Sequence, residues 1–131
     1  MKKILYIIIA ICGILSCRNF GKTSFSDLDF RREHGNEYAY NKDGSVFSGT
    51  AWSSDGKTMK IEVYNGVIKS TTVYHSNGNI ACTVTLSTNP KNESYYDING
   101  NAISKQQFKI EYHEVMVQAG AFEHEVHYIE K

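Results

Sequence analysis

The chain has 131 residues, and its 14 Lys plus Arg balance 14 Asp plus Glu, so the formal net charge is zero. A hydrophobic content of 41% with 21% charged residues is typical of one folded globular domain and excludes a disordered chain. The zero net charge argues against a nucleic-acid-binding surface, so no nucleic acid is expected as a partner. One proline, ten glycines, nine tyrosines and six phenylalanines favour β-hairpins over helices.

The N-terminal residues have the pattern of an export signal. Lys2 and Lys3 precede residues 4–15, a run of twelve residues without charge. A helix that spans a membrane needs about 20 apolar residues, whereas this run has the length of the apolar region of a signal peptide. The alternative is a buried helix or strand of the core. The two lysines and the extreme N-terminal position favour export.

The end of this run resembles the lipobox of bacterial lipoproteins, on the residues Ile14, Leu15, Ser16 and Cys17. The resemblance implies that residues 1–16 are removed as a signal peptide and that Cys17 becomes the first mature residue and carries lipid. It also implies a place in the bacterial cell envelope, at the outer membrane or a periplasmic face. Several acyl chains anchor a protein firmly, since each buried CH₂ contributes about 0.8 kcal/mol. Cys12 would leave with the signal peptide, so Cys82 would lack a partner for an intrachain disulfide.

Residues 17–36 are predicted to be a polar tether between the lipid and the domain. Its first half is expected to hold the domain off the membrane. Its second half is expected to dock on the domain as a short helix or an irregular strand, through Leu28 and Phe30. The domain itself is assigned to residues 37–131.

Asp-Gly and Asn-Gly pairs divide the domain at regular intervals. Both pairs tolerate the positive φ that tight hairpin turns require. The turn glycines are Gly44, Gly56, Gly66, Gly78 and Gly100. Their spacings are 12, 10, 12 and 22 residues, and the last equals two shorter intervals, so a further turn is expected at residues 87–92. The spacing predicts a two-strand unit that repeats every 22 residues.

Strand-like runs fill the intervals between these turns. They are expected at residues 59–64, 67–74, 80–86 and 94–98. Several of them alternate apolar with polar residues, which is typical of half-buried strands. The pattern predicts an all-β fold that is built from successive hairpins. Cys82 lies in one of the runs and is expected to be a small core residue rather than a nucleophile.

Aromatic residues precede the turns, at Tyr40, Trp52, Tyr64, Tyr74 and Tyr96. One interpretation is that each stacks on its counterpart one repeat away and holds the sheet together. The other is that they join Tyr95 and Tyr112 in a binding stripe for a sugar or a partner strand. The sequence favours stacking, and the binding stripe stays a hypothesis.

Residues 64–80 carry a family resemblance. The pattern is an Asn-Gly turn, a Thr-rich strand, and a second aromatic followed by Asn-Gly, on the residues Tyr64, Asn65, Gly66, Tyr74, Asn77 and Gly78. It resembles the MORN-repeat variant found in YwqK-type, antitoxin-like bacterial proteins, and the likeness extends over residues 40–104. The resemblance implies an open, twisted antiparallel sheet of successive hairpins, without shared catalytic residues. It also implies roles in protein contact, scaffolding or lipid contact.

The C-terminal residues combine histidines with acids, at Glu111, His113, Glu114, Glu123, His124, Glu125 and His127. The second group is one residue short of the His-Glu-x-x-His zinc motif. The apolar residues 115–117 and 126–129 are interpreted instead as the strands of a final hairpin. No metal ion or cofactor is therefore expected.

The sequence indicates a binding protein rather than an enzyme. No Ser, Cys or Lys has a base and an orienting partner nearby in the sequence, and the glycines form no phosphate-binding loop. We expect a lipid-anchored cell-envelope module that binds or scaffolds another envelope protein. Two alternatives stay open, namely an immunity or antitoxin-like inhibitor of a toxin and a carbohydrate-contacting accessory lipoprotein. The sequence does not indicate the oligomeric state.

Overall fold

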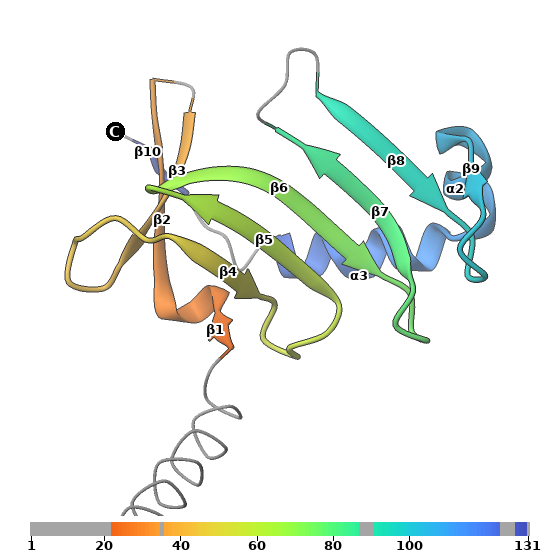
Figure 1. Ribbon diagram of the computed structural model, residues 1–131, viewed down its shortest axis with the longest axis horizontal. Coiled ribbons are helices and arrows are strands. Elements are labelled where there is room, and N and C mark those ends of the chain that lie inside the picture. Colours follow the sequence, from red (N-terminus) through yellow and green to blue (C-terminus); the bar gives the residue numbers. More distant parts are fainter. Residues whose placement is uncertain (1–21, 35, 87–90, 124–127, 131) are drawn as a thin grey trace, which may run out of the picture.

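The computed structural model describes residues 22–34, 36–86, 91–123 and 128–130. Within these residues, strands form an open, mixed sheet, and two short α-helices pack on one side of it (Figure 1). This architecture confirms the predicted all-β open sheet. Several predictions concern residues outside the described ranges, namely the signal peptide at 1–16, the lipid on Cys17, part of the turn at 87–92, and the histidines His124 and His127.

Successive antiparallel hairpins form the body of the sheet. From β4 to β9, each strand pairs with the next in chain order. The strands are β4 Gly49–Trp52, β5 Met59–Tyr64, β6 Val67–Tyr74, β7 Ile80–Thr85, β8 Asn92–Tyr96 and β9 Ala102–Ile103. The turns after β4, β6 and β8 lie toward the lower end of the sheet in Figure 1, whereas the turn after β5 lies at the opposite end. The 22-residue period therefore brings every second turn to the same end.

The five predicted turn glycines all have positive φ, at Gly44, Gly56, Gly66, Gly78 and Gly100. Gly66 is the most constrained of them. It follows Asn65, which also has a positive φ of 51°, and a Cβ at Gly66 would lie 3.2 Å from the Cγ1 atom of Val46. Two consecutive positive φ values are the signature of the tight hairpin turn that Asn-Gly favours.

The N-terminal segment belongs to the sheet, which corrects its assignment as a tether up to residue 36. Its elements are β1 Thr23–Ser24, the 3₁₀ turn η1 Phe25–Asp27, β2 Leu28–Glu33 and β3 Asn36–Asn41. β2 and β3 form a hairpin, and β3 joins β6 through Tyr38 and Val67. The physical reason is burial of three large apolar side chains, Phe25, Leu28 and Phe30. Burial of such a side chain contributes roughly 1.5–3 kcal/mol, so the described part of the domain begins well before residue 37.

Two pairings at the margins are parallel, which corrects the purely antiparallel prediction. β1 pairs with β4, and β10 (Tyr128–Glu130) pairs with β2. Parallel neighbours need a long crossover between them, whereas antiparallel neighbours need only a tight turn. Both pairs satisfy this requirement, since β10 returns to β2 only after the helices. The hairpin periodicity carries no information about such distant pairs.

The C-terminal hairpin prediction is wrong, because residues Lys105–Glu111 form helix α2 and His113–Glu123 form helix α3. Ser104 caps α2, and its hydroxyl oxygen accepts a hydrogen bond from the backbone N–H of Gln107 at 3.0 Å. The residues that pack against the core are Tyr112, Val115 and Ala119. Their spacings of three and four residues follow the helical period. Packing of this partly buried stripe on the core stabilises a helix rather than a strand, although Val115 and its neighbours have strand propensity.

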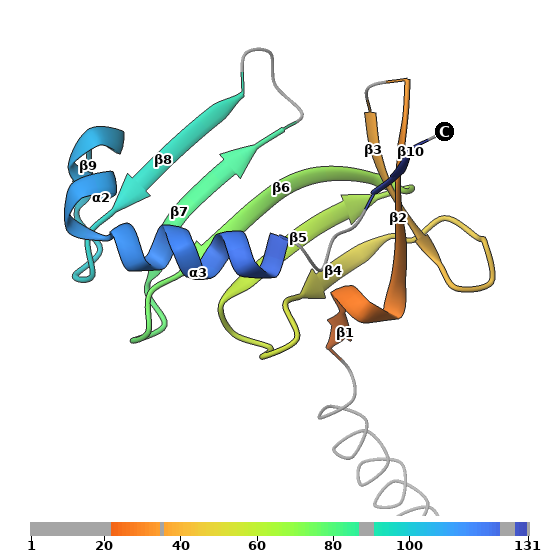
Figure 2. The same cartoon turned by 180° about the vertical axis from the view of Figure 1, so that it is seen from behind.

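The helices give the sheet two different faces. α3 runs across β6 and β7 on one side, which we call the inner face (Figure 2). Along β5, Met59, Ile61 and Val63 are buried and alternate with the half-buried Lys60 and Glu62, so the first three face the core. The alternate residues point to the opposite side, which we call the outer face.

Candidate binding surface on the outer sheet face

The outer face carries rows of hydroxyl side chains that run across the strands. One row follows the strand register through Trp52, Lys60, Thr72, Thr83 and Ser94. A second row follows it through Thr50, Glu62, Ser70 and Thr85. Directly paired residues point to the same face of a sheet, and neighbouring strands lie ≈ 4.7–4.9 Å apart. The register therefore gives the outer face polar side chains at a regular spacing, although Thr72 itself is buried.

An aromatic pair ends the first row. Trp52 of β4 and Tyr74 of β6 stack with ring centroids 5.6 Å apart and ring planes inclined by 18°. They are 22 residues apart, so the contact confirms the predicted stacking between successive repeats for this pair. Such a pair is worth about 0.5–1.5 kcal/mol beyond the apolar area that it buries.

Two lysines surround this aromatic pair. The Lys60 ammonium lies 5.7 Å from the centre of the Trp52 ring and 6.0 Å from that of Tyr74. A hydrogen bond with Tyr74 raises the pKa of Lys60 against the opposing effect of partial burial, and Glu62 adds to the rise. The Lys22 ammonium lies 4.3 Å from the Trp52 ring and donates a hydrogen bond to the Gly56 carbonyl at 2.8 Å. These contacts join the start of the described chain to the end of β4.

The turn between β4 and β5 is organised around one carboxylate. Asp55 accepts hydrogen bonds from the hydroxyls of Ser53, at 2.7 Å, and Thr58, and from the backbone N–H groups of Lys57 and Thr58, each at 3.0 Å. Burial opposes ionisation, but these four donors outweigh it and lower the pKa of Asp55 to about 2. All four hydrogen bonds to the ionised Asp55 carboxylate therefore come from residues of its own turn.

The other predicted aromatic residues do not form one stripe. Tyr40 packs on Tyr38, with centroids 6.4 Å apart, and the Arg31 guanidinium lies 4.6 Å from its ring. Tyr64 is 70% exposed where β5 ends. Tyr96 lies at the end of β8 and pairs with Ala102 of β9. The predicted stripe is therefore divided among separate places.

Two members of the predicted stripe belong to the inner face and form an aromatic cluster that the sequence did not indicate. Phe108 of α2 is completely buried and packs on Tyr95, with centroids 5.1 Å apart, and on Tyr112, at 5.4 Å. His75 lies 4.8 Å from Tyr112, and its Nε2–H donates to the Tyr96 carbonyl at 2.9 Å. The helical spacing of Phe108, Tyr112 and Val115 is the sequence feature that could have predicted this cluster.

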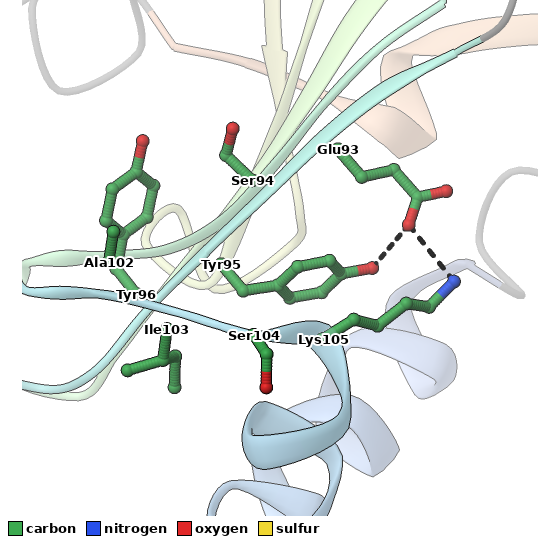
Figure 3. A pocket seen from close by; sticks show the side chains of 8 residues that line it. All are labelled: Glu93, Ser94, Tyr95, Tyr96, Ala102, Ile103, Ser104 and Lys105. Carbon is green, nitrogen blue, oxygen red and sulfur yellow. Dashed lines mark hydrogen bonds and ion pairs between the residues drawn. The ribbon is translucent and has the colours of Figure 1, made fainter.

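A shallow pocket between β8, β9 and the start of α2 offers no activated nucleophile (Figure 3). Its Glu93 accepts hydrogen bonds from the Tyr95 hydroxyl at 2.7 Å and from Lys105 at 3.1 Å, and these bonds lower the pKa of the Glu93 carboxyl. Burial raises the pKa of the nearby Cys82 thiol to about 11, and the Glu93 charge adds to the rise. Cys82 is therefore a thiol rather than a thiolate at neutral pH.

The described residues contain no group of three or more His, Cys, Asp or Glu side chains placed to hold a metal ion. Of the C-terminal acids and histidines, Glu111 ends α2, whereas His113 and Glu114 begin α3. His124 and His127 lie outside the described ranges. Among the described helices, none has the length and apolar character that crossing a membrane requires.

Comparisons with protein-family models, with curated proteins and with solved structures found no match to this chain. The resemblance to MORN-repeat variants therefore stays a hypothesis that rests on the turn motif and its period.

Proposed function

We propose that the protein is a lipid-anchored, non-catalytic module of the cell envelope that binds another envelope protein through the outer face of its sheet. The observation that carries the proposal is the difference between the two faces. α2 and α3 pack on the inner face (Figures 1 and 2). The strand register assigns Trp52, Tyr74 and the hydroxyl rows to the opposite face.

The chemistry of the outer face suits a protein partner. Tryptophan and tyrosine are the residue types that most often dominate binding energy at protein interfaces. Trp52 and Tyr74 are half-buried, so part of each ring remains available for contact. Beside them, Thr72 is buried, whereas the half-buried Thr83 offers both a donor and an acceptor on the same face. If the partner is a toxin, the same surface would serve an immunity or antitoxin-like role.

Photo-crosslinking in membranes tests the binding surface. A photoreactive residue at Thr83, on the outer face, is expected to yield one discrete protein adduct, which mass spectrometry identifies. The matched control places the same residue at Gln107, which is exposed on α2. Equal adducts at Thr83 and Gln107, or none at Thr83, would contradict binding through the outer face.

The lipid anchor is tested separately. Replacing Cys17 with Ser removes the only thiol in the resembled lipobox and is expected to release the protein from the membrane fraction. A variant that still sediments with membranes would contradict the lipoprotein assignment.

A glycan is the second candidate ligand, because the hydroxyl rows are regular. Thr83 and Ser94 lie opposite one another on neighbouring strands and are not buried, which suits a ligand rich in hydroxyl groups. This candidate predicts retarded migration of the protein in gels that contain the envelope polysaccharide. It also predicts that Thr83→Val abolishes the retardation, whereas unchanged migration of the unsubstituted protein would exclude it.

A further inference from the structure

We propose that the end of the sheet formed by Lys22, Trp52 and the turn at residues 53–58 lies against the phospholipid headgroups, with Lys22 and Lys57 on the lipid phosphates. The inference rests on the proposed lipid at Cys17 and concerns how the domain is held at the membrane.

The start of the described chain is fixed at this end of the sheet. Lys22 donates to the Gly56 carbonyl at 2.8 Å, and its ammonium lies 4.3 Å from the Trp52 ring. The next two residues, Thr23 and Ser24, pair with Ala51 and Trp52 as strand β1. β1 and the turn after β4 lie side by side in both views of the molecule (Figures 1 and 2).

The length of chain between the anchor and this point limits the distance to the membrane. Cys17 precedes Lys22 by five residues. A fully extended chain spans at most about 3.3–3.6 Å per residue, so the Lys22 end lies within about 17 Å of the lipidated residue. This limit replaces the expectation of a long tether that holds the domain off the membrane. The opposite end of the sheet lies a whole strand length farther away.

The chemistry of this end suits phospholipid headgroups. Lys22 and Lys57 are exposed, and lysine ammonium groups are attracted to anionic lipid phosphates. Asp55 lies in the same turn, but its carboxylate is occupied by four hydrogen bonds inside the protein. Tryptophan favours the membrane–water interface, which is the depth that this orientation gives to Trp52.

The orientation leaves the proposed binding surface free. The turns after β4 and β6 lie at the same end of the sheet as β1 (Figure 1). With this end against the headgroups, the outer face opens sideways rather than toward the lipid, because side chains stand roughly perpendicular to the sheet. A partner in the same envelope layer therefore reaches the part of the outer face beyond Trp52, along the row of Glu62 and Ser70, without displacing the anchor.

Fluorescence quenching by headgroup-labelled lipid tests the orientation, because Trp52 is the single tryptophan of the chain. The mature chain from residue 17 is coupled through Cys17 to a maleimide phospholipid in phosphatidylcholine–phosphatidylglycerol vesicles that carry a nitroxide on the headgroup. Trp52 is expected to be quenched several-fold more than the tryptophan of a Trp52→Phe, Tyr64→Trp variant. Tyr64 ends β5 at the far end of the sheet and is 70% exposed, so it is the matched control.

Equal quenching at the two positions, or no quenching of Trp52, would overturn the orientation. In the same vesicles, Lys57→Glu is expected to reduce the quenching of Trp52, whereas Lys109→Glu on α2 is expected to leave it unchanged. Equal quenching in both charge variants would overturn the lysine–phosphate contact. Chemical coupling makes this test independent of native lipidation, which the mass of the N-terminal peptide from membranes establishes separately.

Discussion

Trp52 and Tyr74 stack across two strands, with ring centroids 5.6 Å apart, although 22 residues separate them along the chain. The separation equals the period of the turn glycines, so the contact is the structural counterpart of the repeat. It also sits where the proposed binding surface and the proposed membrane-facing end meet.

The two rings are expected to be energetically coupled, so the double variant should lose less stability than the sum of the losses in the two single variants. A double-mutant cycle with Trp52→Leu and Tyr74→Leu should give a coupling free energy of about 0.5–1.5 kcal/mol. Guanidinium chloride unfolding, followed by circular dichroism, measures the free energy of each variant. Tyr64→Leu is the control and should change stability by less than about 0.5 kcal/mol, because Tyr64 is exposed. Additive effects of the two leucine substitutions would show that the rings do not interact.

Phe108 is expected to hold the C-terminal helices on the sheet. Phe108→Ala should destabilise the domain by about 3–5 kcal/mol, because it empties a fully buried site between Tyr95 and Tyr112. Ile110→Ala, two residues away on the same helix, should cost less than about 0.5 kcal/mol, since Ile110 is 75% exposed. Denaturant unfolding compares the two variants. Similar losses of stability would mean that α2 is not anchored through Phe108.

The Asp55 turn predicts a dependence of stability on pH. The pKa of Asp55 is lowered to about 2 in the folded protein from 3.8, so its contribution to stability is complete above pH 3.8 and is lost as the pH falls toward 2. Asp55→Asn should therefore lower the Tm most at neutral pH, and the difference from the unsubstituted protein should shrink toward pH 2. Thermal melts from pH 2 to pH 7 measure this difference. A constant difference across the range would exclude ionised Asp55 as its cause.

Two turn glycines are expected to respond differently to the same substitution. Gly66→Ala and Gly78→Ala both force a Cβ into a positive φ, which costs about 1–2 kcal/mol. At Gly78 the new Cβ meets no atom within 4 Å, whereas at Gly66 it lies 3.2 Å from Val46 Cγ1. Gly66→Ala should thus lower the unfolding free energy further than Gly78→Ala. The reverse order would contradict the packing of Val46 on the β5–β6 turn.

Cys82 is expected to be unreactive in the folded protein. Its thiol is buried, and burial raises its pKa to about 11, so little thiolate is present at pH 8. In a mature chain with Cys17→Ser, iodoacetamide should label Cys82 far more slowly in buffer than in denaturant, as mass spectrometry would show. Equal rates in the two conditions would mean that the thiol is accessible in the native state.

The turn chemistry made much of the sheet predictable. Asn-Gly and Asp-Gly pairs determine where the chain reverses direction, and the short runs between them are predicted to be strands. The predicted limits of β5 and β6 are confirmed, and so is the 22-residue contact between Trp52 and Tyr74. The single aromatic stripe was wrong, because strand alternation places Tyr95 on the inner face and Trp52 on the outer one.

The sequence by itself determined the local features of this protein, namely the turns, the limits of β5 and β6 and the period, because they depend on residues close together in the chain. Only the tertiary structure decided the rest. Burial of Phe25 and Phe30 holds in the sheet the segment that was expected to be a tether. Packing of Phe108 and Val115 on the core stabilises helices where a hairpin was expected. In each case the stabilising free energy comes from burial of apolar surface against strands that are distant in the sequence. A local pattern of residues does not identify those strands.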